Sequence, residues 1–118
     1  MHGYRKLLVW QMAMNLVENI YQVTHEFPAD ERYGLTSQLR RAAVSVPSNI
    51  AEGYSRSHRG DYLRSLSIAR GSLSEVQTQL VLAGRLKFVT RTQLNEPWKL
   101  SESVGKMLTR MILQMQLK

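Results

Sequence analysis

Apolar side chains recur along this chain at alternating steps of four and three residues, the spacing of one buried face on an α-helix. Runs of this kind cover residues 9–27, 35–53, 62–83 and 94–115. The third run keeps the rhythm without interruption from Tyr62 to Ala83. No segment alternates apolar and polar residues at every second position, so we expect four helices and no strands.

Short polar segments separate these runs. The first, "FPADERYG", contains Pro28 and Gly34 as stop signals and Asp30 as an expected local cap. The second, "SRSHRGD", covers residues 55–61, and the third, "RLKFVTRTQ", covers residues 85–93. Connections this short predict an antiparallel, up-down-up-down four-helix bundle, an all-α fold, with residues 1–118 as a single domain.

The fourth helix has two candidate starts. Thr90 and Gln93 have the spacing of a capping box, in which each side chain satisfies a backbone N–H group of the other residue. Pro97, however, lies only a few residues further on. Because proline removes a helical hydrogen bond, the helix is expected either to bend there or to start late, at Asn95.

The stretch "SVPSNIAEG", residues 45–53, places Pro47 inside the second predicted helix. Proline has no N–H group, so it leaves the carbonyl of the residue four positions earlier, Ala43, without its donor. A kink at Pro47 is therefore predicted. Asn49 and Glu52 are expected to supply hydrogen bonds at the edge of the seam that ends at Gly53. We interpret these residues as a structural motif for packing and capping rather than as a catalytic site.

Two predicted helices carry more apolar residues than one buried stripe needs. The additional positions are Trp10, Met14, Val17 and Tyr21 in the first helix, and Ile68, Val81, Leu82 and Leu86 in the third. If these rows are exposed, a single copy would present apolar patches that self-association would cover. The alternative is that the rows widen the side of each helix that faces the core.

Composition adds charge to this picture. The chain has 118 residues, no cysteine and a formal net charge of +7. Residues 1–35 are nearly neutral, whereas residues 36–91 hold nine basic and only three acidic side chains. Arginine dominates, and its planar guanidinium binds phosphate through two hydrogen bonds, so a polyanionic partner is expected unless this face only aids solubility. No run is long and apolar enough to cross a membrane, and the absence of cysteine is compatible with the cytoplasm.

Motifs for catalysis and for cofactors are missing from the sequence. No glutamate is followed three residues later by histidine, the pattern of metal-binding bundles, and no glycine-rich phosphate motif occurs. Ser57 lies next to His58 but lacks a third catalytic partner. We therefore expect no enzymatic activity, no metal site and no cofactor.

Two stretches carry a resemblance to a known family. They are "FPADERYGLTSQLRRAAVSVPSNIAEGYSR", residues 27–56, and "IARGSLSEVQTQL", residues 68–80. The chain resembles the four-helix-bundle family of 23S rRNA-intervening-sequence proteins from Leu8 to about Leu113, and departs from its pattern at Gly60 and Pro97. The resemblance implies a homopentamer without enzymatic activity. A related branch is the basic, nucleic-acid-binding accessory protein of diversity-generating retroelements, which also binds a reverse transcriptase.

Two functions remain open at this stage. The first is a homo-oligomer, a pentamer by the resemblance, that binds RNA or other structured nucleic acid through phosphates. Its candidate contact residues are Arg40, Arg41, Arg56, Arg59, Arg64, Arg70, Arg85 and Lys87. Because the aromatic residues fall mostly on apolar seams, base stacking is not expected. The second is a scaffold with a protein partner, in which the arginines form salt bridges between subunits.

Overall fold

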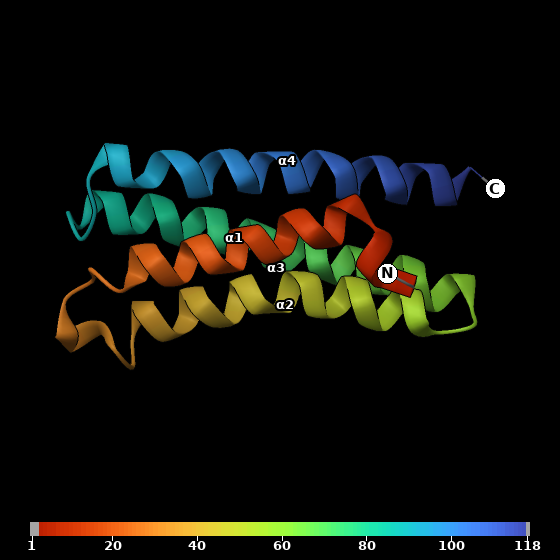
Figure 1. The fold of residues 1–118 in the computed structure, drawn as a ribbon, viewed down its shortest axis with the longest axis horizontal. Helices are drawn as coiled ribbons and strands as arrows, with labels where there is room; N and C mark the ends of the chain where they lie inside the picture. Colours follow the sequence, from red (N-terminus) through yellow and green to blue (C-terminus); the bar gives the residue numbers. More distant parts are fainter. Residues whose placement is uncertain (1–2, 118) are drawn as a thin grey trace.

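The structure, a computed structural model, describes residues 3–117 and contains four long α-helices (Figure 1). The helices are α1 (Leu8–Thr24), α2 (Leu35–Ser55), α3 (Arg59–Arg85) and α4 (Arg91–Gln116). Two short 3₁₀ helices, η1 (Gly3–Lys6) and η2 (Ala29–Glu31), precede α1 and α2. Residues 3–117 include no β-strand, so the predicted all-α, four-helix fold is confirmed.

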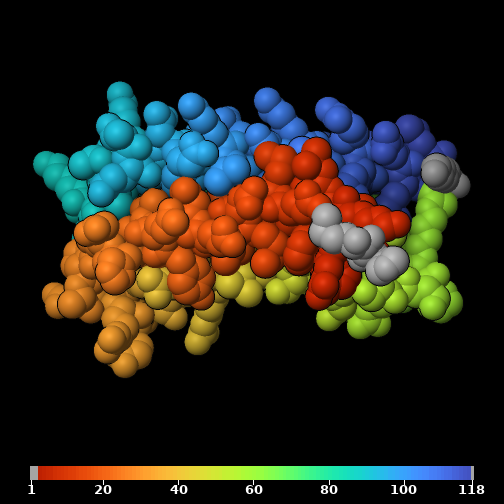
Figure 2. Space-filling view, in the orientation of Figure 1, coloured from red at the N-terminus to blue at the C-terminus, as the bar shows by residue number. Residues whose placement is uncertain are grey.

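Consecutive helices run in opposite directions, and α4 closes the bundle by packing against α1 (Figure 1). The bundle measures 45 × 23 × 21 Å. The helix pair that packs most extensively is α2 with α3. Within the described residues, no Cα atom of α1 lies within 8 Å of a Cα atom of α3, and none of α2 lies within 8 Å of one in α4. One face is covered by α1 and α4, with the connection between α1 and α2 projecting at one end (Figure 2).

The core follows the predicted apolar spacing closely. The runs in α1, α2 and α3 are buried, with Leu16, Leu39 and Leu66 fully inaccessible to solvent. In α4 the four-and-three spacing counted from Leu94 fits less well, because it includes Trp98, which is only partly buried, and omits Val104, which is fully buried. Four amphipathic helices therefore share one apolar interior, as expected when each buries its own stripe.

The seam between α2 and α3 is tight because small residues line it. A Cβ atom built on Gly53 would lie only 2.5 Å from the Ser65 Cβ, so no larger residue fits there without moving a helix. Further along the seam, the Ser45 and Ser72 hydroxyl oxygens lie 2.8 Å apart in a hydrogen bond. Small side chains let the two helices approach closely, which explains why this pair packs most extensively.

Pro47 is buried in α2, which continues from Leu35 to Ser55 across it. The Asn49 amide nitrogen donates to the Ser45 carbonyl oxygen at 2.8 Å and to the Ser45 hydroxyl at 3.0 Å. The predicted hydrogen bonding by Asn49 is thus present, but it serves Ser45 rather than the Ala43 carbonyl. The kink itself stays a prediction.

Helix starts differ from the predicted ones in two places. α3 begins at Arg59, so Arg59, Gly60 and Asp61 form its first turn instead of belonging to the connection. α4 begins at Arg91, and the alternative start at Asn95 is wrong. The predicted capping box explains that start, because Thr90 Oγ1 accepts from the Gln93 N–H at 3.1 Å and Gln93 Oε1 accepts from the Thr90 N–H at 2.8 Å.

The residue that caps α2 is Glu31, whereas the Asp30 side chain, expected as a local cap, forms no hydrogen bond among the described residues. Glu31 Oε1 accepts a hydrogen bond from the Leu35 N–H at 2.9 Å, whereas no side-chain cap comes from the preceding residue, Gly34. A Cβ atom on Gly34 would lie 2.7 Å from that same carboxylate oxygen. A larger residue at position 34 would have to displace this carboxylate, which is the mobile end of a flexible side chain. The end of the connection is therefore fixed to the start of α2.

Candidate nucleic-acid interface

The eight basic residues predicted from the sequence as nucleic-acid contacts lie in four separate regions of the bundle. Arg40 and Arg41 are in the first half of α2. Arg56, Arg59 and Arg64 surround the connection between α2 and α3, and Arg70 lies near the middle of α3. Arg85 and Lys87 are at the connection to α4, where Lys87 has a left-handed backbone with φ of 64°. One copy of the chain does not bring all eight residues together.

A wide, open groove of about 1070 Å³ lies between the end of α1, η2 and the start of α2. We call it the α1–α2 groove. It is lined by Tyr21, Thr24, His25, Phe27, Pro28, Ala29, Arg32, Tyr33, Thr36, Ser37, Arg40, Arg41, Val44 and Ser45. None of these residues is acidic, whereas three are arginines. An anion that enters the groove therefore meets positive charge on its walls without an opposing carboxylate.

Arg40 is held in a defined position within the α1–α2 groove. Its guanidinium carbon lies 4.4 Å from the centroid of the Tyr21 ring, a cation–π contact. Its Nε donates to Thr24 Oγ1 at 2.8 Å, and that hydroxyl in turn donates to the Ile20 carbonyl at 2.7 Å. Within residues 3–117 the two terminal nitrogens of Arg40 have no partner. They are therefore available for a planar, two-point hydrogen bond to phosphate.

Arg32, Arg41 and Tyr33 complete the exposed part of the groove. Both arginines are exposed and, among the described residues, neither forms an ion pair. The Tyr33 side chain is 89% exposed, more than any other large apolar or aromatic residue that the structure describes. Sequence reasoning missed Arg32 and Tyr33 because both lie in a connection, outside the helical patterns. Their place in the sequence could have identified them, because this connection leads directly into the helix that carries Arg40 and Arg41.

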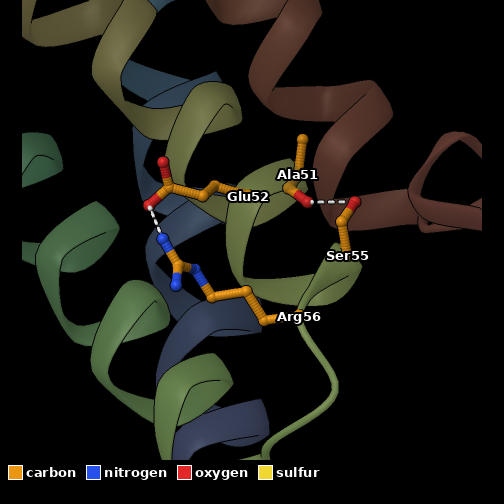
Figure 3. Close-up of polar contacts among 4 residues, drawn as sticks. All are labelled: Ala51, Glu52, Ser55 and Arg56. Atoms are coloured by element: carbon orange, nitrogen blue, oxygen red, sulfur yellow. Dashed lines mark hydrogen bonds and ion pairs between the residues drawn. The ribbon is translucent and has the colours of Figure 1, made fainter.

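The arginines at the other end of α2 lie beside carboxylates. Arg56 Nη2 is 3.9 Å from Glu52 Oε1 one helical turn earlier, an ion pair between two exposed side chains (Figure 3). In the same view the Ser55 hydroxyl donates to the Ala51 carbonyl at 2.9 Å. Arg64 shares a cavity of about 230 Å³ with Glu52 and Asp61. Glu52 therefore balances arginine charge instead of supplying a hydrogen bond near Pro47.

The face between α3 and α4 contains two further grooves of mixed character. Arg70 lines one of about 730 Å³, together with Lys106, Arg110 and the acidic Glu102. Arg85 borders another of about 630 Å³, whose walls are mostly apolar. The apolar residues that line it are Leu80, Val81, Val89, Leu94 and Trp98. The second groove also lacks acidic lining residues, but it holds two arginines, Arg85 and Arg91, among mostly apolar walls, whereas the α1–α2 groove holds three.

The additional apolar rows differ between the two helices. All four positions in and after α3, namely Ile68, Val81, Leu82 and Leu86, are exposed by at least 43%. In α1, Trp10 and Val17 pack against the core, whereas Met14 and Tyr21 are exposed. The row on α1 thus partly widens the core-facing side. The α3 positions stay exposed but are spread out, with Ile68 beside Glu52 and Arg56 at the end of α2 and Val81 beside Leu94 and Trp98 of α4.

The described residues include neither a cluster of metal-ligating side chains nor a membrane-spanning helix. No group of three or more histidine, cysteine or acidic side chains within residues 3–117 could hold a metal ion. None of the helices in that part of the chain combines the length and apolar character needed to span a bilayer.

Comparisons with known proteins agree with the fold. The family model for the 23S rRNA-intervening sequence protein matches residues 5–110. The chain is also similar to the crystal structure of a protein of unknown function from the S23 ribosomal protein family of Bacteroides thetaiotaomicron. The TM-score is 0.80 and the sequence identity is 23%, with 89% of this chain and 98% of that chain covered. At this identity the likeness shows the fold alone. No curated protein matches the chain.

Proposed function

The chain belongs to the 23S rRNA-intervening sequence protein family, and on that premise we propose that it is a non-enzymatic protein that binds RNA through phosphates in the α1–α2 groove. The observation that carries the proposal is the arginine cluster of a groove without acidic lining residues. Arginines that lie beside carboxylates attract phosphate less strongly, because the neighbouring negative charge lowers the local positive potential. A cytoplasmic location suits a chain without cysteine.

Phosphate contacts imply a particular binding behaviour. Each basic side chain that neutralises a phosphate releases a condensed counterion, so affinity falls steeply as salt concentration rises. Phosphate contacts carry no sequence information by themselves. We therefore expect strongly salt-dependent binding with little preference for base sequence.

A filter-binding titration tests this proposal. The full chain is titrated against labelled RNA of mixed sequence at two salt concentrations, about 50 and 200 mM. We expect retention at the lower concentration and a loss of affinity of at least about tenfold at the higher one, for two or more phosphate contacts. Absence of retention at low salt would remove the RNA-binding proposal.

We further propose that the functional form is a homo-oligomer, a pentamer if the family resemblance holds. The supporting observation is that four apolar side chains in and after α3, Ile68, Val81, Leu82 and Leu86, are exposed on a single copy, and contacts with neighbouring copies would cover such residues. Five copies would present five α1–α2 grooves, so weak contacts to one long RNA would reinforce one another. Light scattering tests assembly, and a monomer mass at working concentration would contradict it.

A second candidate function is a scaffold or accessory subunit, for example of a reverse transcriptase, that does not itself bind nucleic acid. The groove lined by Leu80, Val81 and Trp98 favours it, because apolar concave surfaces are typical of protein contacts. Copurification with a reverse transcriptase, lost on Val81→Asp, together with no RNA binding by the chain alone, would favour this second function over the first.

A further inference from the structure

We infer that the α1–α2 groove selects single-stranded RNA over duplex RNA, because Tyr33 offers a ring on which an unpaired base can stack beside the arginines. The inference rests on the proposed RNA-binding function and adds the class of RNA that the groove accepts. It also reverses the expectation that aromatic residues are unavailable for stacking, since Tyr33 lies in a connection and not on an apolar seam.

The exposure of Tyr33 has no structural explanation within one chain. Its side chain is 89% exposed, and no ring contact, hydrogen bond or ion pair involves it in the described part of the molecule. Other tyrosines pack against rings, as Tyr54 does against Tyr62 at 5.8 Å between centroids. An exposed aromatic ring that lines a basic groove is the arrangement typical of single-strand-binding surfaces.

The backbone that carries Tyr33 is well anchored. The Glu31 N–H donates to the Pro28 carbonyl at 2.9 Å, and the Gly34 N–H donates to the Glu31 carbonyl at 2.9 Å. The Glu31 carboxylate then ties the connection to α2 through Leu35. Phe27, at the other end of the connection, is buried and packs against Phe88 at 5.7 Å between ring centroids. Tyr33 is therefore presented from a fixed backbone, which lowers the entropic cost of binding.

The groove combines what a single strand offers and a duplex does not. Arg40, fixed by Tyr21 and Thr24, and the exposed Arg41 can bind phosphates along the same surface that Tyr33 lines. In a single strand a base can leave its neighbours and stack on the Tyr33 ring, whereas duplex bases are paired and stacked inside the helix. Duplex RNA would thus contact only the arginines.

Fluorescence anisotropy with two probes tests this inference on the full chain. The probes are a labelled twelve-nucleotide RNA of mixed sequence without internal pairing and the duplex of the same strand with its complement. We expect Tyr33→Ala to weaken binding of the single strand by about 5- to 100-fold, the range for losing one stacked base, and to leave duplex affinity unchanged within about twofold. Tyr33→Phe should keep the wild-type preference because phenylalanine retains the ring.

Two controls keep the result interpretable. Tyr54→Ala removes a partly exposed ring at the other end of α2 and should leave both affinities unchanged. Circular dichroism melting should show that Tyr33→Ala folds normally, since the ring makes no contact that the fold requires.

The outcomes separate this inference from the proposed function. If the wild-type chain binds neither probe at low salt, the proposed function itself fails. If it binds both probes in a salt-dependent manner and Tyr33→Ala changes neither affinity, or changes both equally, RNA binding stands and the single-strand selectivity is overturned.

Discussion

The two halves of α2 use the same kinds of residue for opposite purposes. The first half borders the open α1–α2 groove, whose lining includes Arg40 and Arg41 and no acidic residue, although Arg41 also lines a smaller cavity with Glu75. The second half packs tightly against α3 through Gly53, and its Arg56 is paired with Glu52. Arginine content alone therefore says little about binding, because what matters is whether a carboxylate already balances the charge. We expect changes in the second half to alter stability and changes in the first half to alter RNA affinity.

The largest effect is expected for Gly53→Ala, in the second half of α2. The new Cβ would lie 2.5 Å from the Ser65 Cβ, an atom fixed to its own backbone, so α2 and α3 must separate. Overpacking of this kind costs up to about 3 kcal/mol, more than the roughly 1 kcal/mol that alanine gains in helix propensity. Urea unfolding measures the change in the free energy of unfolding, and RNA affinity of the folded fraction should be unaltered.

Gly71→Ala is the matched control on α3. A Cβ there meets no atom within 4 Å, so only the propensity gain remains, and the variant should be more stable by about 1 kcal/mol. If both glycine variants shift stability in the same direction and by similar amounts, tight packing at Gly53 is not what distinguishes this half of α2.

The next effect concerns the groove. The double variant Arg32→Ala/Arg41→Ala removes two exposed cations and leaves the structural contacts of Arg40 in place. We expect RNA affinity to fall about tenfold near 100 mM salt and the slope of log affinity against log salt to decrease by about two. Filter binding over a salt series measures both quantities, and the free energy of unfolding should stay within about 0.5 kcal/mol of wild type.

The double variant Arg56→Ala/Arg64→Ala provides the comparison for the groove variant. It removes the same formal charge from the other end of α2, where Glu52 and Asp61 lie close by. Affinity should change by less than about threefold, from the loss of long-range attraction alone. An equal loss in both double variants would mean that net charge rather than the groove controls binding.

A smaller effect is expected for Asn49→Ala. The two hydrogen bonds from the Asn49 amide to Ser45 together add about 1 kcal/mol to the free energy of unfolding. The higher helix propensity of alanine offsets roughly 0.6 kcal/mol of their loss. Asn15→Ala, at an exposed position on α1, receives only the propensity gain. The difference between the two variants in urea unfolding should therefore be about 1 kcal/mol, and a difference near zero would deny Asn49 a stabilising role.

The smallest effect is the pH dependence of Tyr62, which packs against Tyr54 where α2 meets α3. Burial, and to a lesser extent the neighbouring Tyr54, raises the pKa of Tyr62 above its ordinary value of 10.0. Because the folded chain favours the neutral phenol, the raised pKa of Tyr62 adds to the free energy of unfolding below about pH 10. This contribution is lost as pH rises through the raised pKa. Urea midpoints between about pH 8 and pH 11 should fall less steeply for Tyr62→Phe than for wild type. Tyr33→Phe, at an exposed ring, should follow wild type.

The helices were predictable from the sequence because each buries a regular stripe of apolar residues. The errors occur at helix ends, where local hydrogen bonds determine the first residue and its cap. The seven-residue rhythm located Leu66 and Val76 in the core without further information. It could not show that α3 begins at Arg59, because polar residues of a first turn are not distinguishable from those of a connection. Nor could it assign the cap of α2 to Glu31, which depends on the path of the chain around Gly34.

The site was less predictable than the fold. Charge counting found Arg40 and Arg41 but treated them as equivalent to Arg56 and Arg64, because ion pairing depends on neighbours in space. Arg32 and Tyr33 were missed since a connection has no periodicity to mark which side chains face a groove. These residues become recognisable only once the end of α1 and the start of α2 are placed side by side.

Photo-crosslinking of the wild-type chain to single-stranded RNA containing 4-thiouridine tests RNA binding in the α1–α2 groove most directly. Mass spectrometry of the digested complex then identifies the crosslinked peptides. We predict crosslinks within residues 21–45, above all at Tyr33, and none within residues 52–64. Crosslinks concentrated in residues 52–64, or spread evenly over the basic side chains of the bundle, would contradict the assignment of RNA binding to this groove.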